Sequence, residues 1–221
     1  MKVLIVGQGL AGSVLSHYLT QNQIEHKVMD NHHKTAATKA AAGLINPITG
    51  RNYVKSWKID DLIPAAISCY TAFEKMLGIS LVSRREVVRT LHEIAQENKW
   101  MESTSRPGYT EYCSDQFIEN PYRDFTRAEG KFALIKNALQ VNIGELIVAY
   151  RSYLQKKNLL IEEHFLFDQL DFVKGVTIGD EHFDTIVFCE GSAVADNPLF
   201  NTLPFQPAKG EAFIIEFKEK L

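Results

Sequence analysis

The hydrophobic pattern of the chain begins with an apolar run at residues 3–6, rich in β-branched side chains, that predicts a buried strand. After a glycine-containing turn, apolar residues recur at helical spacing over residues 10–19. A second strand-like run covers residues 25–29. Because parallel strands need a crossover connection, usually a helix, this order predicts the first βαβ unit of an α/β fold.

The middle of the chain carries a different pattern. Residues 60–77 predict a long amphipathic helix, and residues 82–91 have the β-branched density of a strand. Residues 92–130 are mixed, polar and rich in turn residues, and strand-like alternation returns over residues 131–139. We therefore expect a sheet-rich α+β insertion in this part of the chain.

Helix and strand patterns alternate again after the expected insertion. Residues 143–156 predict a second clear helix, and residues 159–167 and 173–178 predict strands. The short apolar run at residues 185–189 then leads into Gly191, much as the first strand leads into its glycine turn. We expect this run to be a further parallel strand whose C-terminal end opens toward a ligand.

Together these patterns predict a doubly wound, Rossmann-like nucleotide-binding domain with an inserted substrate domain. We assign residues 1–80 and 140–204 to the nucleotide-binding domain, and residues 81–139 and 205–221 to the substrate domain. Residues 211–217 form a strand-like run with nothing after it to cover or pair it. An uncovered apolar edge promotes aggregation, so we expect a longer natural chain or a second copy of the chain to cover it.

The turn after the first predicted strand holds Gly7, Gly9 and Gly12 in the spacing G-x-G-x-x-G. Between a strand and a helix, this spacing predicts a tight turn at the first glycine, close backbone approach to a pyrophosphate at the second, and close helix packing at the third. Leu10 and Ala11 would then present the N-terminus of the helix to the phosphates. The turn therefore predicts a dinucleotide site.

The second predicted strand ends at Asp30, close to the spacing at which a carboxylate meets the ribose hydroxyls of a dinucleotide. A carboxylate there favours a free 2′-hydroxyl and repels a 2′-phosphate, and Asn31, His32 and His33 supply no arginine to receive one. The two histidines also lack a nearby set of Cys or carboxylate ligands, so we expect no metal site here.

Composition narrows the choice of partners and compartment. The formal net charge of −3, with no long block of Lys and Arg, does not suggest nucleic acid as a partner. No apolar stretch approaches the ~20 residues that span a bilayer, and the N-terminus has no signal-type pattern. The 3 cysteines lie far apart without a C-x-x-C pair, which fits reduced thiols. We therefore expect a cytoplasmic protein with a small-molecule ligand.

A second motif, residues 38–47 (TKAAAGLINP), follows Asp30 at loop distance, and its small residues let the backbone approach a ligand closely. A nicotinamide site does not need such a motif. It resembles the Ala-Ala-Gly-Leu-x-x-Pro segment of the D-amino-acid oxidase and glycine oxidase superfamily, whose members hold FAD and oxidise the C–N bond of amines. Residues 141–143, 189–192 and 206–211 resemble further segments of that family, although Cys189 and Glu190 stand where the family has small residues.

The resemblance implies an FAD site and a small amine or amino acid as substrate. Thr38 would lie near the phosphates, and Ala42, Gly43 and Leu44 would line the isoalloxazine ring. The full set of cofactor-binding candidates is Gly7, Gly9, Leu10, Ala11, Gly12, Asp30, Asn31, Thr38, Ala42, Gly43, Leu44, Leu166, Cys189, Glu190 and Gly191. The substrate-binding residues of the family belong to a segment beyond residue 221, so the sequence names no catalytic residue.

Two other functions remain open on the sequence. An NAD-linked dehydrogenase would use the same glycine turn, although the second motif and the long insertion disfavour it. A non-catalytic module that binds FAD or another nucleotide would need the turn alone. Some residues have two readings, as ligand contacts or as ordinary packing: Arg51, Tyr53, Lys55, Ser56 and Trp57 after the second motif, and Tyr109, Tyr112 and Tyr122 in the insertion.

Overall fold

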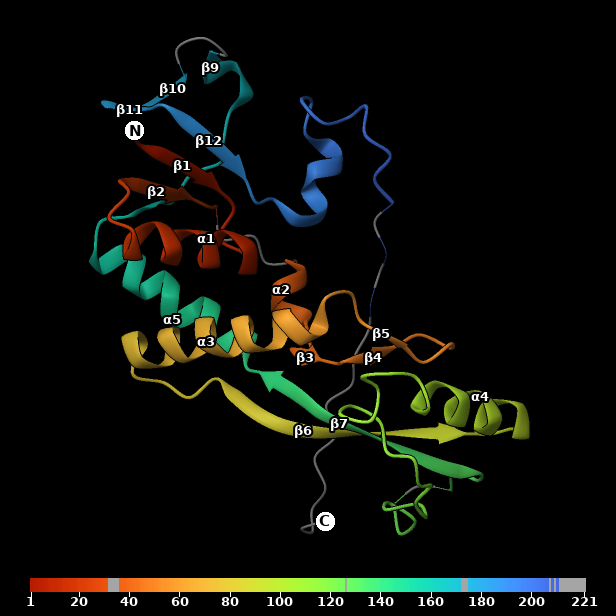
Figure 1. Ribbon diagram of the computed structural model, residues 1–221. Coiled ribbons are helices and arrows are strands. Elements are labelled where there is room, and N and C mark those ends of the chain that lie inside the picture. The colour runs from red at the N-terminus through yellow and green to blue at the C-terminus, as the bar shows by residue number, and fades with distance from the viewer. Residues whose placement is uncertain (32–35, 126, 172–174, 207, 209, 211–221) are drawn as a thin grey trace. The chain divides into compact units, whose positions relative to one another are not determined.

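Figure 1 shows the computed structural model, which describes residues 1–31, 36–125, 127–171, 175–206, 208 and 210. The chain divides into two compact units. The first contains Met1–Ala41, Met76–Ile79 and the described part of Ile143–Ala212, and the second contains Ala42–Lys75 and Ser80–Asn142. Residues 42–75 thus lie with the second unit, whereas the sequence assigned them to the nucleotide-binding domain. The functional division into domains stays a prediction.

The first unit is built on a parallel sheet with the strand order β12-β1-β2-β8. The inner strands are β1 (Val3–Val6) and β2 (His26–Met29), flanked by β12 (Thr185–Phe188) and β8 (Leu160–Ile161). Every residue of β1 is buried, as expected of a strand covered on both faces. The predicted parallel strand near residue 185 is confirmed beside β1, far from it in sequence.

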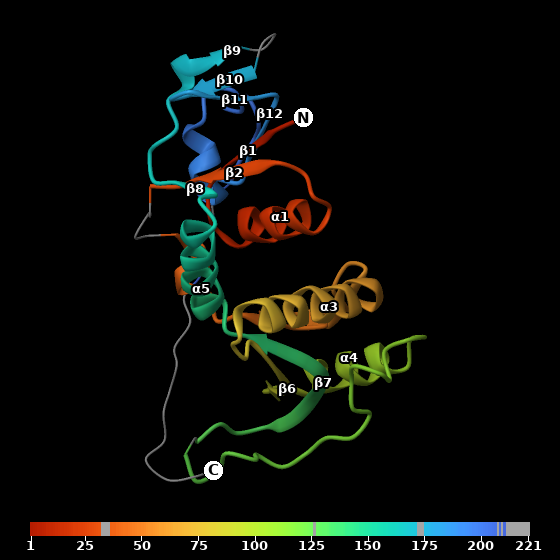
Figure 2. The same ribbon diagram turned by 90° about the vertical axis from the view of Figure 1, so that its left-hand side faces the viewer.

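Helices cover one face of this sheet (Figures 1 and 2). They are α1 (Leu10–Gln21) and α5 (Ile143–Lys156), and the short helix α2 (Ala37–Ala40) packs against α5. Gly12 of α1 faces β1, because a Cβ atom built on it would lie 3.3 Å from Cγ2 of Ile5. Both long helices fall where the apolar spacing of the sequence predicts them.

A buried chain of hydrogen bonds ties the two helices to β2. The Tyr150 hydroxyl donates to Ser16 Oγ at 2.9 Å, and Ser16 Oγ lies 2.8 Å from Nε2 of His26. Burial raises the pKa of Tyr150 to about 12, so its hydroxyl stays protonated and keeps donating. The side chains of Tyr150, Ser16 and His26 are therefore all hydrogen-bonded, as buried polar groups usually are.

A small antiparallel sheet covers the other face of the parallel sheet (Figure 2). It has the order β11-β10-β9 and contains β9 (Leu170–Asp171), β10 (Gly175–Ile178) and β11 (Glu181–Phe183). The buried core between the two sheets consists of Leu4, Val6, Met29, Phe165, Val176, Ile178 and Phe183. The Rossmann-like α/β fold is thus confirmed, with an antiparallel sheet opposite the helices.

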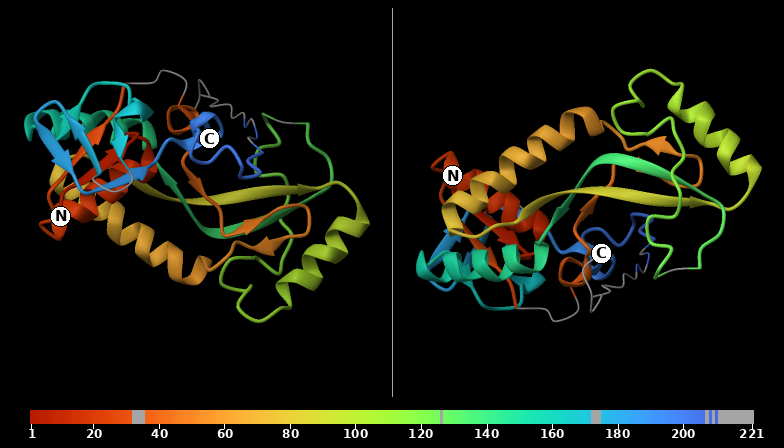
Figure 3. Two further views of the ribbon diagram at one scale, coloured as in Figure 1. Left: turned by 90° about the horizontal axis from the view of Figure 1, so that it is seen from above. Right: turned by 90° about the horizontal axis from the view of Figure 1, so that it is seen from below.

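The second unit is built on two long antiparallel strands, β6 (Val82–Leu91) and β7 (Lys131–Val141), which run side by side (Figure 3). The short strand β3 (Leu44–Ile45) pairs with the other edge of β7. Two further short strands, β4 (Ile48–Thr49) and β5 (Val54–Lys55), pair with each other. The predicted strands at residues 82–91 and 131–139 are therefore confirmed, the second extending to residue 141.

The remaining elements of the second unit are α3 (Ile59–Leu77), whose last residues group with the first unit, and α4 (Ile94–Thr104). Trp100 of α4 is fully buried, and its Nε1 donates to the carbonyl of Ser114 at 2.9 Å. The buried core of this unit consists of Ile48, Tyr53, Ile59, Leu91, Trp100, Tyr109, Tyr112, Cys113, Ala133 and Ile135.

Two expectations from the sequence are wrong in detail. The strand expected over residues 159–167 is only β8, because the chain then leaves the sheet edge, buries Phe165 against the sheet face, and enters a 3₁₀ helix at Phe167–Gln169. Residues 92–130 were expected to be rich in turns, and this expectation missed the helix α4, because most of the residues of α4 are polar. The strand expected at residues 173–178 is found as β10, while residues 172–174 and the predicted strand at 211–217 lie outside the described residues.

Candidate functional site

Two glycines of the turn after β1 are required by the fold itself. Gly7 has a φ of +104°, and a Cβ atom on it would lie 2.5 Å from the carbonyl oxygen of Cys189. This contact is tight because the backbone N–H of Cys189 donates to the carbonyl of Val6 at 2.7 Å. A Cβ atom on Gly12 would lie 1.9 Å from the carbonyl oxygen of Gly7. The tight turn and the close helix packing expected from the sequence are confirmed.

Gly9 is different, because no backbone contact in the structure requires it. It lies at the N-cap of α1 with a φ of −79°, which any residue adopts. A Cβ atom on it would meet only the side-chain Oγ1 of Thr38, at 3.2 Å. The glycine therefore leaves bare backbone at the N-terminus of a twelve-residue helix, and this is the feature that a pyrophosphate group needs.

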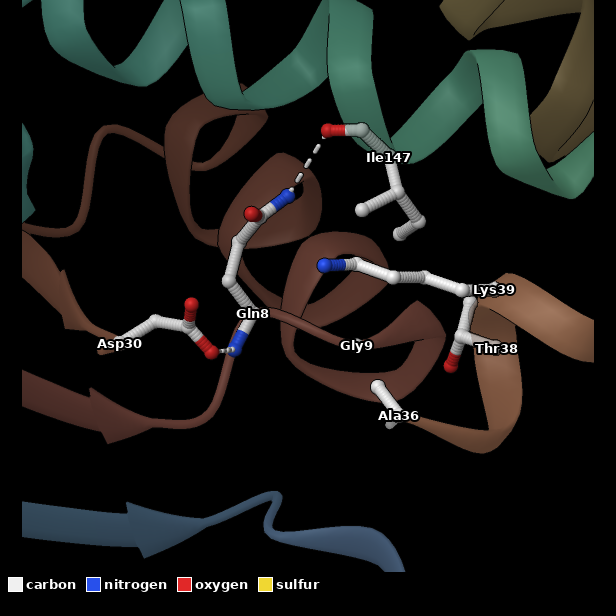
Figure 4. A pocket seen from close by; sticks show the side chains of 7 residues that line it. All are labelled: Gln8, Gly9, Asp30, Ala36, Thr38, Lys39 and Ile147. Atoms are coloured by element: carbon white, nitrogen blue, oxygen red, sulfur yellow. Dashed lines mark hydrogen bonds between the residues drawn. The ribbon is translucent and has the colours of Figure 1, made fainter. Parts of the chain in front are cut away.

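A pocket in the first unit includes this bare backbone (Figure 4). Figure 4 shows the side chain of Lys39 reaching across the glycine turn, and Asp30 at the opposite end of the pocket. The lining residues are Gln8, Gly9, Asp30, Ala36, Thr38, Lys39 and Ile147. A carboxylate, a cation, a hydroxyl and a helix N-terminus thus converge on one site, which fits the ribose and phosphates of a nucleotide.

Asp30 follows β2 directly and is held by two other residues of the first unit. The backbone N–H of Gln8 donates to Oδ2 of Asp30 at 2.9 Å, and Nη1 of Arg151 donates to Oδ1 at 2.8 Å. The Asp30 side chain is 16% exposed and lines the pocket, so it presents a carboxylate there.

Several residues of this site escaped the sequence analysis, namely Gln8, Ala36, Lys39, Ile147 and Arg151. Arg151 carried a signal that could have found it. It lies on the same stripe of α5 as the buried residues Ile147 and Leu154, at helical spacing. Charged residues are almost never fully buried unless they are paired, so an arginine on an apolar stripe indicates a buried carboxylate partner.

The other candidates in the first unit lie at the ends of its strands and helices. Leu10 donates its backbone N–H to Oγ1 of Thr38 at 3.4 Å, so Thr38 stands at the helix N-terminus. Ala11 and Asn31 are exposed, and Leu166 is half exposed in the loop after β8. That these residues contact a cofactor stays a prediction.

Three further candidates, Cys189, Glu190 and Gly191, follow β12. Gly191 begins a 3₁₀ helix at Gly191–Asp196, and Glu190 Oε2 accepts a hydrogen bond from Asn197 Nδ2 at 2.6 Å. Burial raises the pKa of the Cys189 thiol, and the neighbouring Glu190 raises it further. Cys189 is therefore a neutral thiol rather than a nucleophile.

Ala42, Gly43 and Leu44 of the Ala-Ala-Gly-Leu motif belong to the second unit. There the carbonyl of Gly43 accepts the backbone N–H of Val141 at 2.9 Å, and Leu44 pairs with Gln140 across β3 and β7. The Leu44 side chain is 47% exposed. The motif is thus anchored to β7, and the apolar side chain of Leu44 stays largely exposed. Its contact with a flavin stays a prediction.

Packing accounts for several residues that had two readings on the sequence. Tyr53 is buried against Trp100, with ring centroids 5.2 Å apart. The Tyr112 hydroxyl donates to Asp60 Oδ1 at 2.9 Å, and Lys55 Nζ donates to Asp60 Oδ2 at 2.6 Å. These interactions join the start of α3 to the core of the second unit. Trp57 is 77% exposed and has no such role.

Within the described residues, no group of three or more His, Cys, Asp and Glu side chains has an arrangement that could hold a metal ion. In the same part of the chain, no helix combines the length and the apolar character that crossing a membrane requires.

The model of the FAD dependent oxidoreductase family matches residues 2–221. The chain belongs to this family. The family resemblance found in the glycine turn and the second motif is therefore confirmed, and FAD rather than NAD is the cofactor of the family. The bare backbone at Gly9 and the carboxylate of Asp30 in the same pocket fit the diphosphate and ribose that FAD carries.

Several solved structures share the fold of the chain. Glycine oxidase from Geobacillus kaustophilus matches 87% of this chain and 56% of its own, with a TM-score of 0.65 and 15% identity. Iminodiacetate oxidase from Chelativorans sp. BNC1 matches 88% and 56%, with a TM-score of 0.61 and 18% identity. L-proline dehydrogenase from P. horikoshii matches 93% and 56%, with a TM-score of 0.62 and 12% identity. The chain thus spans little more than half the length of these proteins.

Proposed function

We propose that this protein is an FAD-dependent oxidoreductase that oxidises the C–N bond of a small amino acid or related amine. The observation that carries the proposal is the pocket at Gly9, where a glycine that the fold does not need stands between a carboxylate and a lysine. The names of the matched structures support the substrate class, since they are oxidases of glycine and iminodiacetate and a dehydrogenase of proline.

The chain's own residues have a binding role in this proposal. The backbone at Gly9 and Leu10, with Thr38 beside it, would hold the pyrophosphate. Asp30 would accept hydrogen bonds from the ribose hydroxyls. When bound, the flavin supplies a hydride acceptor, so the protein contributes placement of the substrate and exclusion of water more than acid–base groups. Ala42, Gly43 and Leu44 would line the flavin ring. This division explains why, among the described residues that line the pocket, no pair of titratable groups resembles a catalytic acid and base.

The test is a visible spectrum of the protein purified as its gene encodes it, followed by anaerobic titration with glycine, iminodiacetate and L-proline. We expect a flavin absorption band that one of these amines bleaches. A protein that binds flavin and is bleached by no amine or amino acid would instead be a non-catalytic flavin module. A colourless protein that takes up no added FAD would contradict the proposal altogether.

A further inference from the structure

Gln8 is the residue between Gly7 and Gly9 in the glycine turn, and it is only 4% exposed. Glutamine is mostly exposed in folded proteins, and a buried amide costs free energy unless it is hydrogen-bonded. Figure 4 shows the side chain of Gln8 reaching from the turn toward α5, while its backbone stays beside Gly9 in the pocket. The G-x-G-x-x-G spacing sets no requirement at this position, so the buried glutamine has another role.

The amide of Gln8 is hydrogen-bonded to both long helices of the first unit. Its Nε2 donates to the carbonyl of Ile147 in α5 at 3.1 Å and to Oγ of Ser13 in α1 at 3.3 Å. Its Oε1 accepts from Nη1 of Arg151 in α5 at 3.2 Å. The backbone N–H of Gln8 donates to Oδ2 of Asp30, the residue after β2, at 2.9 Å. Side chain and backbone thus fix the middle of the turn to three separate segments.

The two partners on α5 require a side chain that both donates and accepts. A backbone carbonyl only accepts hydrogen bonds, and a guanidinium only donates them. The neutral amide of glutamine meets both at once, with its Nε2 toward Ile147 and its Oε1 toward Arg151. A methionine of similar length would satisfy neither partner, and an asparagine is shorter by one methylene group. The two partners therefore fix the orientation of the Gln8 amide.

Gly9 is the part of the turn that depends most on such an anchor. Glycine loses more conformational freedom on folding than any other residue, so its backbone is the hardest to hold in one arrangement. Backbone N–H groups bind a phosphate when they point at it together, and groups already held in that arrangement bind more tightly because less freedom is lost. Gln8 is the neighbour of Gly9 in the chain and supplies this restraint from α5.

We propose that Gln8 is a positioning residue that holds the bare backbone at Gly9 in the arrangement that the diphosphate of FAD requires. This inference rests on the proposed nucleotide site. Gln8 acts through the backbone, because its own amide is turned toward α5 and bonded there. Substitution of the side chain leaves the backbone N–H that donates to Asp30 in place. Loss of the amide should therefore weaken binding of the phosphates and spare binding of the adenosine part.

The test measures the affinities of ADP and adenosine by NMR titration, together with the order parameter of the Gly9 amide in the ligand-free protein. We expect Q8M to lower the affinity for ADP about tenfold, the effect of one or two hydrogen bonds, and that for adenosine less than about twofold. Q8M should also lower the order parameter of Gly9. Q8N should act in the same direction. The control Q155M makes the same change at an exposed residue of α5 that does not line the pocket, and should match the wild type.

The comparison of the two ligands separates positioning from a merely structural role. Equal losses of affinity for ADP and adenosine in a folded Q8M variant, or no loss, overturn the inference while the proposed site stands. Where adenosine binds too weakly to titrate, a wild-type order parameter at Gly9 in Q8M overturns it. If Q8M does not fold, Q8N decides, and if neither folds, Gln8 is a requirement of the fold and the inference is wrong. A wild type that binds neither ADP nor FAD overturns the proposed site and the inference together, before any variant is made.

Discussion

The glycine turn shows, residue by residue, how a spacing motif combines requirements of the fold with a requirement of the ligand. A side chain at Gly7 or Gly12 would clash with a backbone carbonyl oxygen. The Cβ position of Gly7 lies 2.5 Å from the oxygen of Cys189, and that of Gly12 lies 1.9 Å from the oxygen of Gly7. Gly9 has only a side-chain oxygen nearby, at 3.2 Å. Removing the first two therefore tests folding, and removing the third tests binding.

We expect Gly12→Ala to lower the free energy of unfolding by about 3 kcal/mol, because its Cβ atom has no space beside the backbone of Gly7. We expect Gly9→Ala to cost at most about 1 kcal/mol, the usual effect of alanine at an N-cap, while affinity for FAD and for ADP falls at least about tenfold. Thermal unfolding and ligand titration measure both. A Gly9→Ala protein with wild-type affinity would place the phosphates elsewhere.

The sequence predicted the residues of the site that follow a spacing rule, and missed those that depend on packing. Asp30 follows from its distance to the glycine turn, since both lie in one βαβ unit. Arg151 lies 121 positions further along the chain, and no local rule connects it to Asp30. Lys39 lies in the second motif, whose role was predicted from its small residues and not from its charge. A site built from distant segments is predictable only in the part that one segment contains.

The elements that the sequence predicted well are those with strong periodicity or a buried apolar run. β1, α1, α5 and β12 fall where expected, because each is packed on a core that imposes its pattern. α4 was missed because a helix that buries little besides Trp100, Ser103 and Thr104 has a weak apolar stripe. The strand predicted at residues 159–167 was longer than β8, because an apolar residue after an edge strand, here Phe165, can cover the sheet without belonging to it.

Glu181 of β11 joins the antiparallel sheet to the parallel sheet. Its carboxylate binds Nζ of Lys2, just before β1, at 2.6 Å, and it also binds Lys27 of β2. The hydrogen bond from Lys2, then that from Lys27, lowers the pKa of Glu181 below its ordinary value. A carboxylate with a lowered folded-state pKa stabilises the fold above its ordinary pKa, and this contribution is lost as the pH falls through the folded-state value.

We therefore expect Glu181→Gln to lower the free energy of unfolding at pH 7 and to reduce the loss of stability on acidification below about pH 5. Denaturant unfolding of the wild type and the variant between pH 7 and pH 3 measures both effects. Glu163→Gln is a matched control, because it removes an exposed carboxylate from the same unit. Parallel stability curves for wild type and Glu181→Gln would show that this ion pair does not contribute to the acid sensitivity.

At the scale of the whole molecule, the candidate site of the first unit draws on segments that the second unit separates in sequence. Gln8, Gly9, Asp30, Thr38 and Lys39 precede most of the second unit, and α5 follows it. Residues 42–44 of the second motif lie in the second unit, next to the point where β3 pairs with β7. FAD contains both an adenine nucleotide and a flavin, whereas ADP contains the nucleotide alone. Comparing the two ligands therefore tests what each unit contributes to binding.

Hydrogen exchange in the presence of saturating ADP or saturating FAD separates these contributions. Because a ligand that binds only the folded state slows local opening, ADP should protect the amides of residues 7–12 and 26–31, while residues 82–91 keep their exchange rates. FAD should protect the same amides and, in addition, those of residues 43–45, since family resemblance places this motif against the flavin ring. Identical protection by ADP and FAD would mean that Gly43 and Leu44 do not contact the flavin. In that case the exposed Leu44 side chain would serve a contact other than the cofactor.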